Sequence, residues 1–142
     1  MSLWLDGTLA VDRFQPFLGA QAHYFHRENG RLYGNYPRMQ AVVAAPLFWP
    51  ILVVPNARNL SPEALAVIGR ILEKFAASTI AVLCAWLFYL LALQIAERRV
   101  AWWLTAAFAI ATPMASTVAQ ALWSHTLALP FLMAAFLFGL KS

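Results

Sequence analysis

Two long stretches without any charged side chain restrict the fold of this chain more than any other feature. No Asp, Glu, Lys or Arg occurs in 75–96 or in 100–140. A helix needs about 20 mostly apolar residues to cross roughly 30 Å of hydrocarbon. Only 11% of the residues are charged and 62% are hydrophobic, whereas about a quarter of a soluble domain is charged. The sequence therefore predicts an all-α integral membrane protein.

These stretches predict three transmembrane helices within 75–140. The first, at about 75–96, is a single apolar run. The second stretch is long enough for two spans, and Pro113 with its polar neighbours favours a turn near its middle. We therefore expect helices at about 100–114 and 120–140.

The segment 41–55 is also apolar, but it is short for a span and contains three prolines. Two interpretations remain open. The segment crosses the membrane and gives a fourth span, or it packs at the membrane surface or re-enters from one side. The fold class is accordingly three to four transmembrane helices, with an amphipathic segment and an N-terminal extramembrane region.

An amphipathic segment is expected at 56–74. Ser61, Pro62 and Glu63 are typical of a helix start, with Ser61 as the cap and Pro62 in the first turn. The following helix either lies along the membrane interface or simply extends the first span beyond the bilayer.

The region 1–40 carries most of the polar side chains and is predicted to lie outside the membrane. Within it, the pair Asn29 and Gly30 separates two short extended arms, at 24–26 and 32–33. This pair is a strong signal for a tight turn, so we expect a small β-hairpin.

The distribution of Lys and Arg predicts the orientation in a bacterial cytoplasmic (inner) membrane. The basic loop 97–99 and the end at 141–142 should be cytoplasmic, which puts 113–119 outside. Residues 56–74 are then outside as well. The side of 1–40 stays open: cytoplasmic if 41–55 crosses and the chain starts at Met1, outside if a preceding span is missing from the chain.

No metal, cofactor or nucleic-acid site is predicted. His23, His26 and Glu28 have no established ligand spacing, and a hairpin would alternate their directions. The net charge is +4, but Lys and Arg are scattered among acidic residues, which does not favour nucleic-acid binding. Membrane lipid is the expected partner.

Three polar residues are candidates for chemistry. Asp6 and Asp12 are the only aspartates, and each is either a solvated carboxylate or a general base that takes the proton of an attacking group. His125 lies at the outer end of the last predicted helix. It is either an anchor at the headgroup level or a functional group.

Two blocks of sequence resemble a known group of bacterial multi-spanning membrane proteins. The first block is Gly-Arg-Leu-Tyr-Gly-Asn-Tyr-Pro at 30–37, followed by Ala45 and Pro46. The second is Ala-Thr-Pro at 111–113 with Ala-Gln-Ala-Leu-Trp-Ser-His at 119–125. The chain is similar, over about 5–140, to polyprenyl-phosphate-sugar-dependent glycosyltransferases of the GT-C fold, the group that includes protein mannosyltransferases.

The resemblance implies transfer of a sugar from a polyprenyl-phosphate donor at the outer membrane face. In that family an acidic residue of the first outer loop acts on the acceptor. Asp12 falls at the expected place, with Asp6 as the second candidate. His125, Arg31 and Arg38 would then meet the donor phosphate.

The chain also departs from the family pattern. Arg38 and Met39 follow Pro37 where relatives tend to have Pro-Gly, Ala111 replaces a usual Gly, and such enzymes have many more spans. The resemblance therefore implies a fragment that is inactive alone and packs against other transmembrane helices of a longer chain or of a partner. The alternative is a small non-enzymatic four-span membrane subunit or helper. A transporter is disfavoured, because His125 is the only ionisable residue in the predicted spans.

Overall fold

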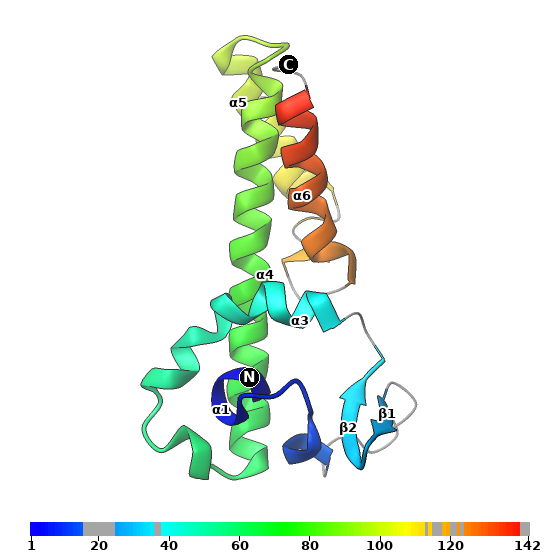
Figure 1. Ribbon diagram of the computed structural model, residues 1–142. Helices are drawn as coiled ribbons and strands as arrows, with labels where there is room; N and C mark the ends of the chain where they lie inside the picture. Colours follow the sequence, from blue (N-terminus) through cyan, green and yellow to red (C-terminus); the bar gives the residue numbers. More distant parts are fainter. Residues whose placement is uncertain are drawn as a thin grey trace. The chain divides into compact units, whose positions relative to one another are not determined.

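The computed structural model confirms that the chain is mostly helical (Figure 1). It describes residues 1–15, 25–35, 38–112, 114, 118–119, 122 and 124–139, and of Arg38, Ser124 and His125 only the backbone. The α-helices are α1 (Ser2–Asp6), α3 (Arg38–Ala44), α4 (Pro62–Ala92), α5 (Arg98–Ala111) and α6 (Ser124–Gly139). Short 3₁₀ helices are η1 (Asp12–Phe14), η3 (Ala45–Val53) and η4 (Ala57–Asn59). The chain forms two compact units, Met1–Glu73 and Lys74–Ser142, called unit 1 and unit 2 below.

The hairpin predicted around Asn29 and Gly30 is present in unit 1. Strands β1 (Phe25–Glu28) and β2 (Arg31–Gly34) pair antiparallel, in a register that sets Glu28 opposite Arg31. The two turn residues have positive φ values, 52° for Asn29 and 79° for Gly30. A two-residue turn with both φ angles positive matches the twist of the strands, and Asn-Gly adopts it at little cost.

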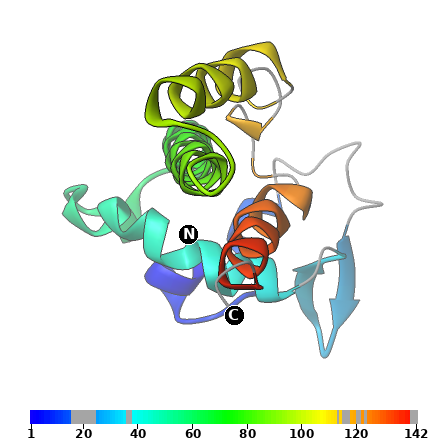
Figure 2. The same cartoon turned by 90° about the horizontal axis from the view of Figure 1, so that it is seen from above.

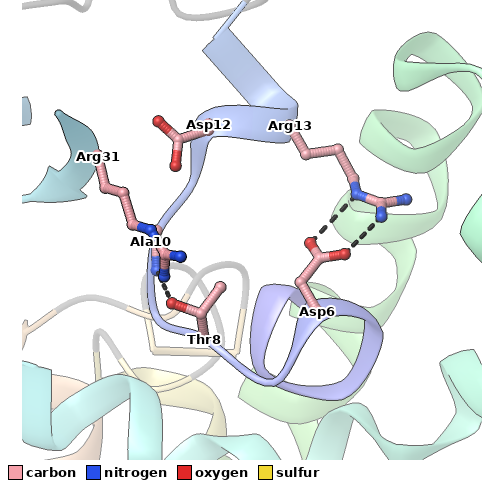
Figure 3. Close-up of a pocket in the computed structure, with 6 residues that line it drawn as sticks. All are labelled: Asp6, Thr8, Ala10, Asp12, Arg13 and Arg31. Atoms are coloured by element: carbon pink, nitrogen blue, oxygen red, sulfur yellow. Dashed lines mark hydrogen bonds and ion pairs between the residues drawn. The ribbon is translucent and has the colours of Figure 1, made fainter.

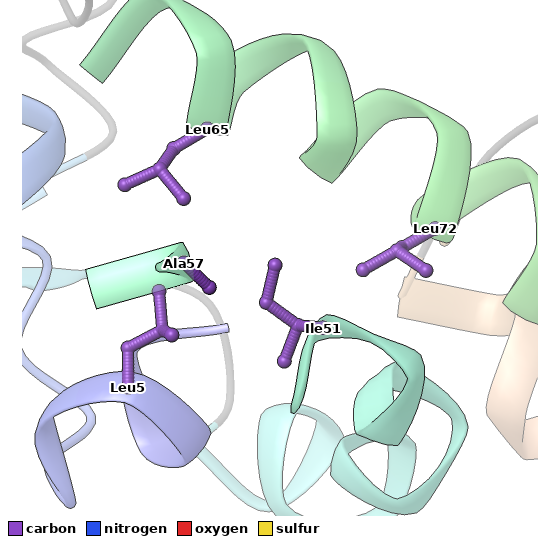
Figure 4. Close-up of a cluster of buried hydrophobic side chains, with 5 residues drawn as sticks. All are labelled: Leu5, Ile51, Ala57, Leu65 and Leu72. Atoms are coloured by element: carbon purple, nitrogen blue, oxygen red, sulfur yellow. The ribbon is translucent and has the colours of Figure 1, made fainter. Parts of the chain in front are cut away.

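The core of unit 1 is built by segments that are far apart in the sequence (Figure 4). Its buried side chains come from α1, η3, η4 and the first part of α4: Leu5, Ile51, Ala57, Leu65 and Leu72. Ile51 and Leu65 are completely buried. The indole Nε1 of Trp4 also donates a hydrogen bond to the carbonyl oxygen of Ala45, at 2.6 Å. These contacts attach α1 to the start and the middle of η3.

Helix α4 begins where the sequence predicts. Its first residue is Pro62, and the hydroxyl of Ser61 accepts a hydrogen bond from the backbone N–H of Ala64 at 3.3 Å. The helix then runs unbroken to Ala92, so the predicted amphipathic segment and the predicted span at 75–96 share one helix. The helix ends four residues before the predicted boundary at 96.

Unit 2 consists of the rest of α4 with α5 and α6, which lie on different sides of it (Figure 2). Aromatic pairs join α4 to α5: Phe88 stacks on Phe108 with ring centroids 4.3 Å apart, and Tyr89 contacts Trp102 at 5.7 Å. Helix α6 contains Pro130 and nevertheless continues to Gly139.

Among the described residues, one helix is long and apolar enough to cross a membrane, namely α4. Helix α5 has 14 residues and α6 has 16, whereas a span needs about 20. The sequence predicts three to four spans. The lengths of the described helices support fewer spans than that. The predicted turn at 113–119 and the start of the predicted helix 120–140 fall largely outside the described residues.

The apolar segment 41–55 is neither a straight helix nor a loop. It contains the end of α3, and the chain continues directly into η3 at Ala45. Pro46 lies in the first turn of η3 and Pro50 lies inside it. Because proline removes a backbone donor from the helical ladder, an α-helix cannot continue regularly through this stretch.

Candidate active site

An open pocket in unit 1 brings together several of the predicted site residues (Figure 3). Its volume is about 390 Å³. The lining side chains come from the end of α1, the loop after it, η1 and the start of β2: Asp6, Thr8, Ala10, Asp12, Arg13 and Arg31.

A short connection between α1 and η1 positions the two aspartates. Gly7 ends α1 in the left-handed region with φ 66°, and its N–H bonds to the carbonyl oxygen of Leu3. This conformation favours glycine and is a common helix ending. The hydroxyl of Thr8 then accepts a hydrogen bond from the N–H of Ala10 at 3.2 Å. The chain turns within a few residues, so Asp6 and Asp12 both reach the pocket.

Asp12 is held against the hairpin. Its Oδ1 accepts a hydrogen bond from the backbone N–H of Leu32 at 2.9 Å, and the N–H of Val11 donates to the carbonyl oxygen of Leu32 at 2.8 Å. These two bonds bring the neighbouring Arg31 to the pocket wall (Figure 3). Within the described part of the chain, the guanidinium of Arg31 has no hydrogen bond or ion pair, and Asp12 has no further one. One carboxylate oxygen and one cation are therefore free to meet a ligand there.

Asp6 is engaged differently. The Nε of Arg13 donates to Oδ2 of Asp6 at 3.2 Å, and a second guanidinium nitrogen pairs with Oδ1. The same guanidinium donates to the carbonyl oxygen of Arg58 at 2.7 Å. Bidentate arginine–carboxylate pairs fix both side chains in one geometry. Both oxygens of Asp6 thus accept hydrogen bonds from Arg13, whereas among the described residues only Oδ1 of Asp12 accepts one.

Of the remaining predicted site residues, Arg38 and His125, the structure describes only the backbone. Arg38 is the first residue of α3 in unit 1, and His125 lies near the start of α6 in unit 2. Their side chains lie outside the described part, as does His23. Sequence reasoning missed Thr8, Ala10 and Arg13. Arg13 could have been suspected, because a cation directly after a candidate base is well placed to pair with a nearby carboxylate.

His26 lies on the hairpin and is not among the pocket residues. Its Nδ1 lies 2.7 Å from Oδ1 of Asn35, and its Nε2 lies 3.9 Å from the carboxylate of Glu28. The ring also stacks on Tyr33. In the part of the chain that the structure describes, no three His, Cys, Asp or Glu side chains come together as metal ligands would.

Comparison with known proteins gives no match to any protein-family model, any curated protein or any solved structure.

Proposed function

We propose that this chain belongs to a membrane glycosyltransferase that transfers a sugar from a polyprenyl-phosphate donor at the outer face of a bacterial inner membrane. Asp12 acts as the general base on the acceptor, and Arg31 binds the donor phosphate. The observation that carries the proposal is that these two side chains, from η1 and β2, line one pocket. A carboxylate removes a proton from an attacking group, and a guanidinium stabilises charge on a phosphate.

Exposed apolar side chains support the membrane part of the proposal. The most apolar window of α4 has a mean hydropathy of 2.1, and only 33% of it is buried. A core helix of a soluble protein would be mostly covered. Large exposed apolar side chains occur on all three helices of unit 2, including Val82, Trp86, Trp103, Ile110, Phe136 and Phe138. We therefore assign α4, α5 and α6 to the membrane, with Glu97 and the first two residues of α5, Arg98 and Arg99, in the cytoplasm and 113–119 outside.

The ion pair of Asp6 with Arg13 gives these residues a supporting role in the proposed site. The pair leaves the pocket with one unpaired carboxylate, on Asp12, and one unpaired guanidinium, on Arg31, within the described residues. This charge pattern suits a hydroxyl or amide of the acceptor beside Asp12 and a phosphate of the donor beside Arg31. Asp6 remains the second candidate for the base.

Substitution of Asp12 by Asn tests the proposal in the full-length membrane protein supplied with a polyprenyl-phosphate sugar. General-base catalysis contributes about 10² to 10⁴-fold to a rate, so we expect transfer to fall by that order while the protein still inserts and folds. Asp6→Asn is the matched control, and its effect on the rate should be smaller. Arg31→Ala should raise the KM for the donor.

A second candidate function is a non-enzymatic membrane subunit. The outward apolar side chains of α4, α5 and α6 favour it, because such faces also suit packing against helices of a partner. In that case Asp12→Asn leaves both sugar transfer and co-purification with the partner unchanged. Unchanged transfer in this variant would exclude Asp12 as the base.

A further inference from the structure

The α3–η3 segment carries a continuous uncharged surface on unit 1. No charged residue occurs from Met39 to Ala57. Large apolar side chains point outward along both helices: Met39, Val42, Val43, Trp49, Leu52 and Val53. The most exposed are Met39 and Val53, each at 69%. Other side chains of the segment, Ala44, Ala45 and Ile51, are buried. The segment is thus apolar both where it packs in the core and where it is uncovered.

The residues before this segment contact the residues after it. The guanidinium of Arg13 donates to the carbonyl oxygen of Arg58 at 2.7 Å. Leu5 packs in one cluster with Ala57 and Leu65 (Figure 4). The hydrocarbon core of a bilayer is about 30 Å thick, so groups on opposite sides of it cannot make such contacts. Both flanks of the segment must therefore lie on the same side of a membrane.

A crossing of the membrane by the α3–η3 segment would also cost free energy, because other residues of unit 1 are attached to its buried side chains. If the segment entered the hydrocarbon with unit 1 intact, nearby charges such as Asp6, Arg13 and Arg58 would follow. Charged residues are costly to insert at the centre of a bilayer. The alternative of opening unit 1 would expose Leu5 and Leu65 from its core.

We propose that the α3–η3 segment lies on the membrane surface, with its outward apolar face in the boundary between lipid headgroups and acyl chains. The occupant of this face is the lipid bilayer that α4 crosses, so the inference rests on the membrane part of the proposed function. An uncharged apolar segment with an exposed tryptophan is well suited to this boundary. The segment is then not a fourth span.

Within this proposal, the contacts between the two flanks of the segment also decide on which side of the membrane the N-terminal region lies. The described parts of 1–40 and the residues 56–73 belong to unit 1, and within this proposal they lie on the side of the membrane opposite to the start of α5. Asp12 and Arg31 therefore face the outer side, where a lipid-linked sugar donor is expected.

Cysteine labelling of the full chain in membranes of a bacterial host tests this arrangement. Single substitutions at exposed positions, Gln15→Cys, Asn59→Cys and Arg99→Cys, report the region before the segment, the region after it and the basic loop. The unsubstituted chain gives the background, because its only cysteine, Cys84, is buried. A membrane-impermeant maleimide is applied to spheroplasts and to inverted vesicles.

We expect Gln15→Cys and Asn59→Cys to react in spheroplasts and to lose this reaction in inverted vesicles, whereas Arg99→Cys shows the reverse. Reaction of Gln15→Cys and Asn59→Cys from opposite sides would overturn the surface arrangement and leave the crossing of α4 intact. Reaction of Arg99→Cys from the same side as Asn59→Cys would show that α4 does not cross. That result would overturn the membrane part of the proposed function.

A polarity-sensitive fluorophore then tests the lipid contact itself. Attached to Leu52→Cys in vesicles, it should shift its emission to the blue and be quenched by brominated lipids. Attached to Asn59→Cys, which is exposed but outside the apolar face, it should be quenched much less. Unquenched emission from Leu52→Cys would overturn the lipid assignment in favour of water. Oxidation of Leu52→Cys to a cross-linked dimer, in place of quenching, would overturn it in favour of a second copy of the chain.

Discussion

The two units of this chain differ in how far they bury their apolar side chains. Apart from the exposed surface of α3 and η3, unit 1 has a small core in which Ile51 and Leu65 have no exposed surface. Unit 2 turns many of them outward: Val82 is 70% exposed, Trp103 71% and Phe138 71%. Water disfavours exposed apolar surface. The difference indicates that unit 1 has a core of its own beside one uncovered face, whereas unit 2 exposes apolar side chains on all three helices, and we propose that lipid covers both surfaces.

The units also differ in where they keep their polar groups. Unit 1 contains the pocket, the ion pair of Asp6 with Arg13 and the hydrogen-bonded hairpin. In unit 2, the hydrogen bonds of the described side chains run mostly to the backbone of the same helix, as for Thr79, Thr105 and Thr112. Hydroxyls satisfied by their own helix need no partner from the surroundings. This is the arrangement that an apolar environment demands.

Removal of a core side chain should have the largest effect on unit 1. Leu65→Ala leaves a cavity at a completely buried position, and such changes cost about 2–5 kcal/mol. We expect the free energy of unfolding of unit 1 to fall by this amount, measured by hydrogen exchange of its backbone amides in the full chain. Val67→Ala, two residues away and 58% exposed, should change it far less. Equal effects of the two variants would contradict the assigned core.

A charged side chain added to an exposed position of unit 2 should reduce membrane insertion. On the surface of a soluble protein the same change would have little effect. Val82→Lys introduces a cation on the exposed side of α4 within the proposed span. The cost of inserting such a residue near the bilayer centre is about 2.5–3.5 kcal/mol. We expect a marked loss of membrane-inserted protein, measured by alkaline extraction of membranes. Gln94→Lys, just beyond the end of α4, is the control and should insert normally. Normal insertion of Val82→Lys would contradict the proposal that lipid covers the exposed apolar side chains of unit 2.

Loss of Arg13 should weaken unit 1 without touching unit 2. Arg13→Ala removes three hydrogen bonds, two to the carboxylate of Asp6 and one to the carbonyl oxygen of Arg58. The two side chains of the pair are about one quarter exposed, so we expect a moderate loss of about 1–3 kcal/mol. Arg27→Ala, which removes one exposed hydrogen bond to Gln15, is the matched control. Denaturant unfolding of both variants measures the difference.

Loss of the cap at the start of α4 should have a smaller effect. Ser61→Ala removes the acceptor for the N–H of Ala64, and loss of such a cap typically costs about 1 kcal/mol. Ser61→Asp keeps an acceptor and should retain most of the stability. Amide exchange in the first turn of α4 measures the effect, and an unchanged rate in Ser61→Ala would show that the cap is unimportant.

The pH dependence at this helix start should be the smallest effect. The pKa of Glu63 is lowered, first by a hydrogen bond from its own backbone N–H and second by the hydroxyl of Ser61. A carboxyl with a lowered pKa in the folded state adds stability above its ordinary pKa, and this contribution is lost as the pH falls through the lowered value. Nuclear magnetic resonance titration should show a smaller lowering in Ser61→Ala than in the unsubstituted chain.

Local signals in the sequence were sufficient for the hairpin and for the start of α4. Asn29 and Gly30 tolerate positive φ. Ser61 accepts a hydrogen bond from the first turn of α4, and Pro62 has a backbone conformation that suits this turn. These features depend on neighbours a few residues away, so the sequence predicted them correctly. The helix ends were predicted less well, because α4 and α5 stop before the apolar stretches end.

The sequence also determined the uncharged stretches and the choice of Asp6, Asp12 and Arg31 as candidates. Only the tertiary structure decided that these three side chains line one pocket, because the hydrogen bond from Leu32 to Asp12 joins residues 20 positions apart. Only the tertiary structure decided that Asp6 is bound by Arg13. The segment 41–55 was ambiguous for the same reason: its packing depends on contacts of Ile51 with Leu5 and Leu65, and no local pattern encodes contacts over such a distance.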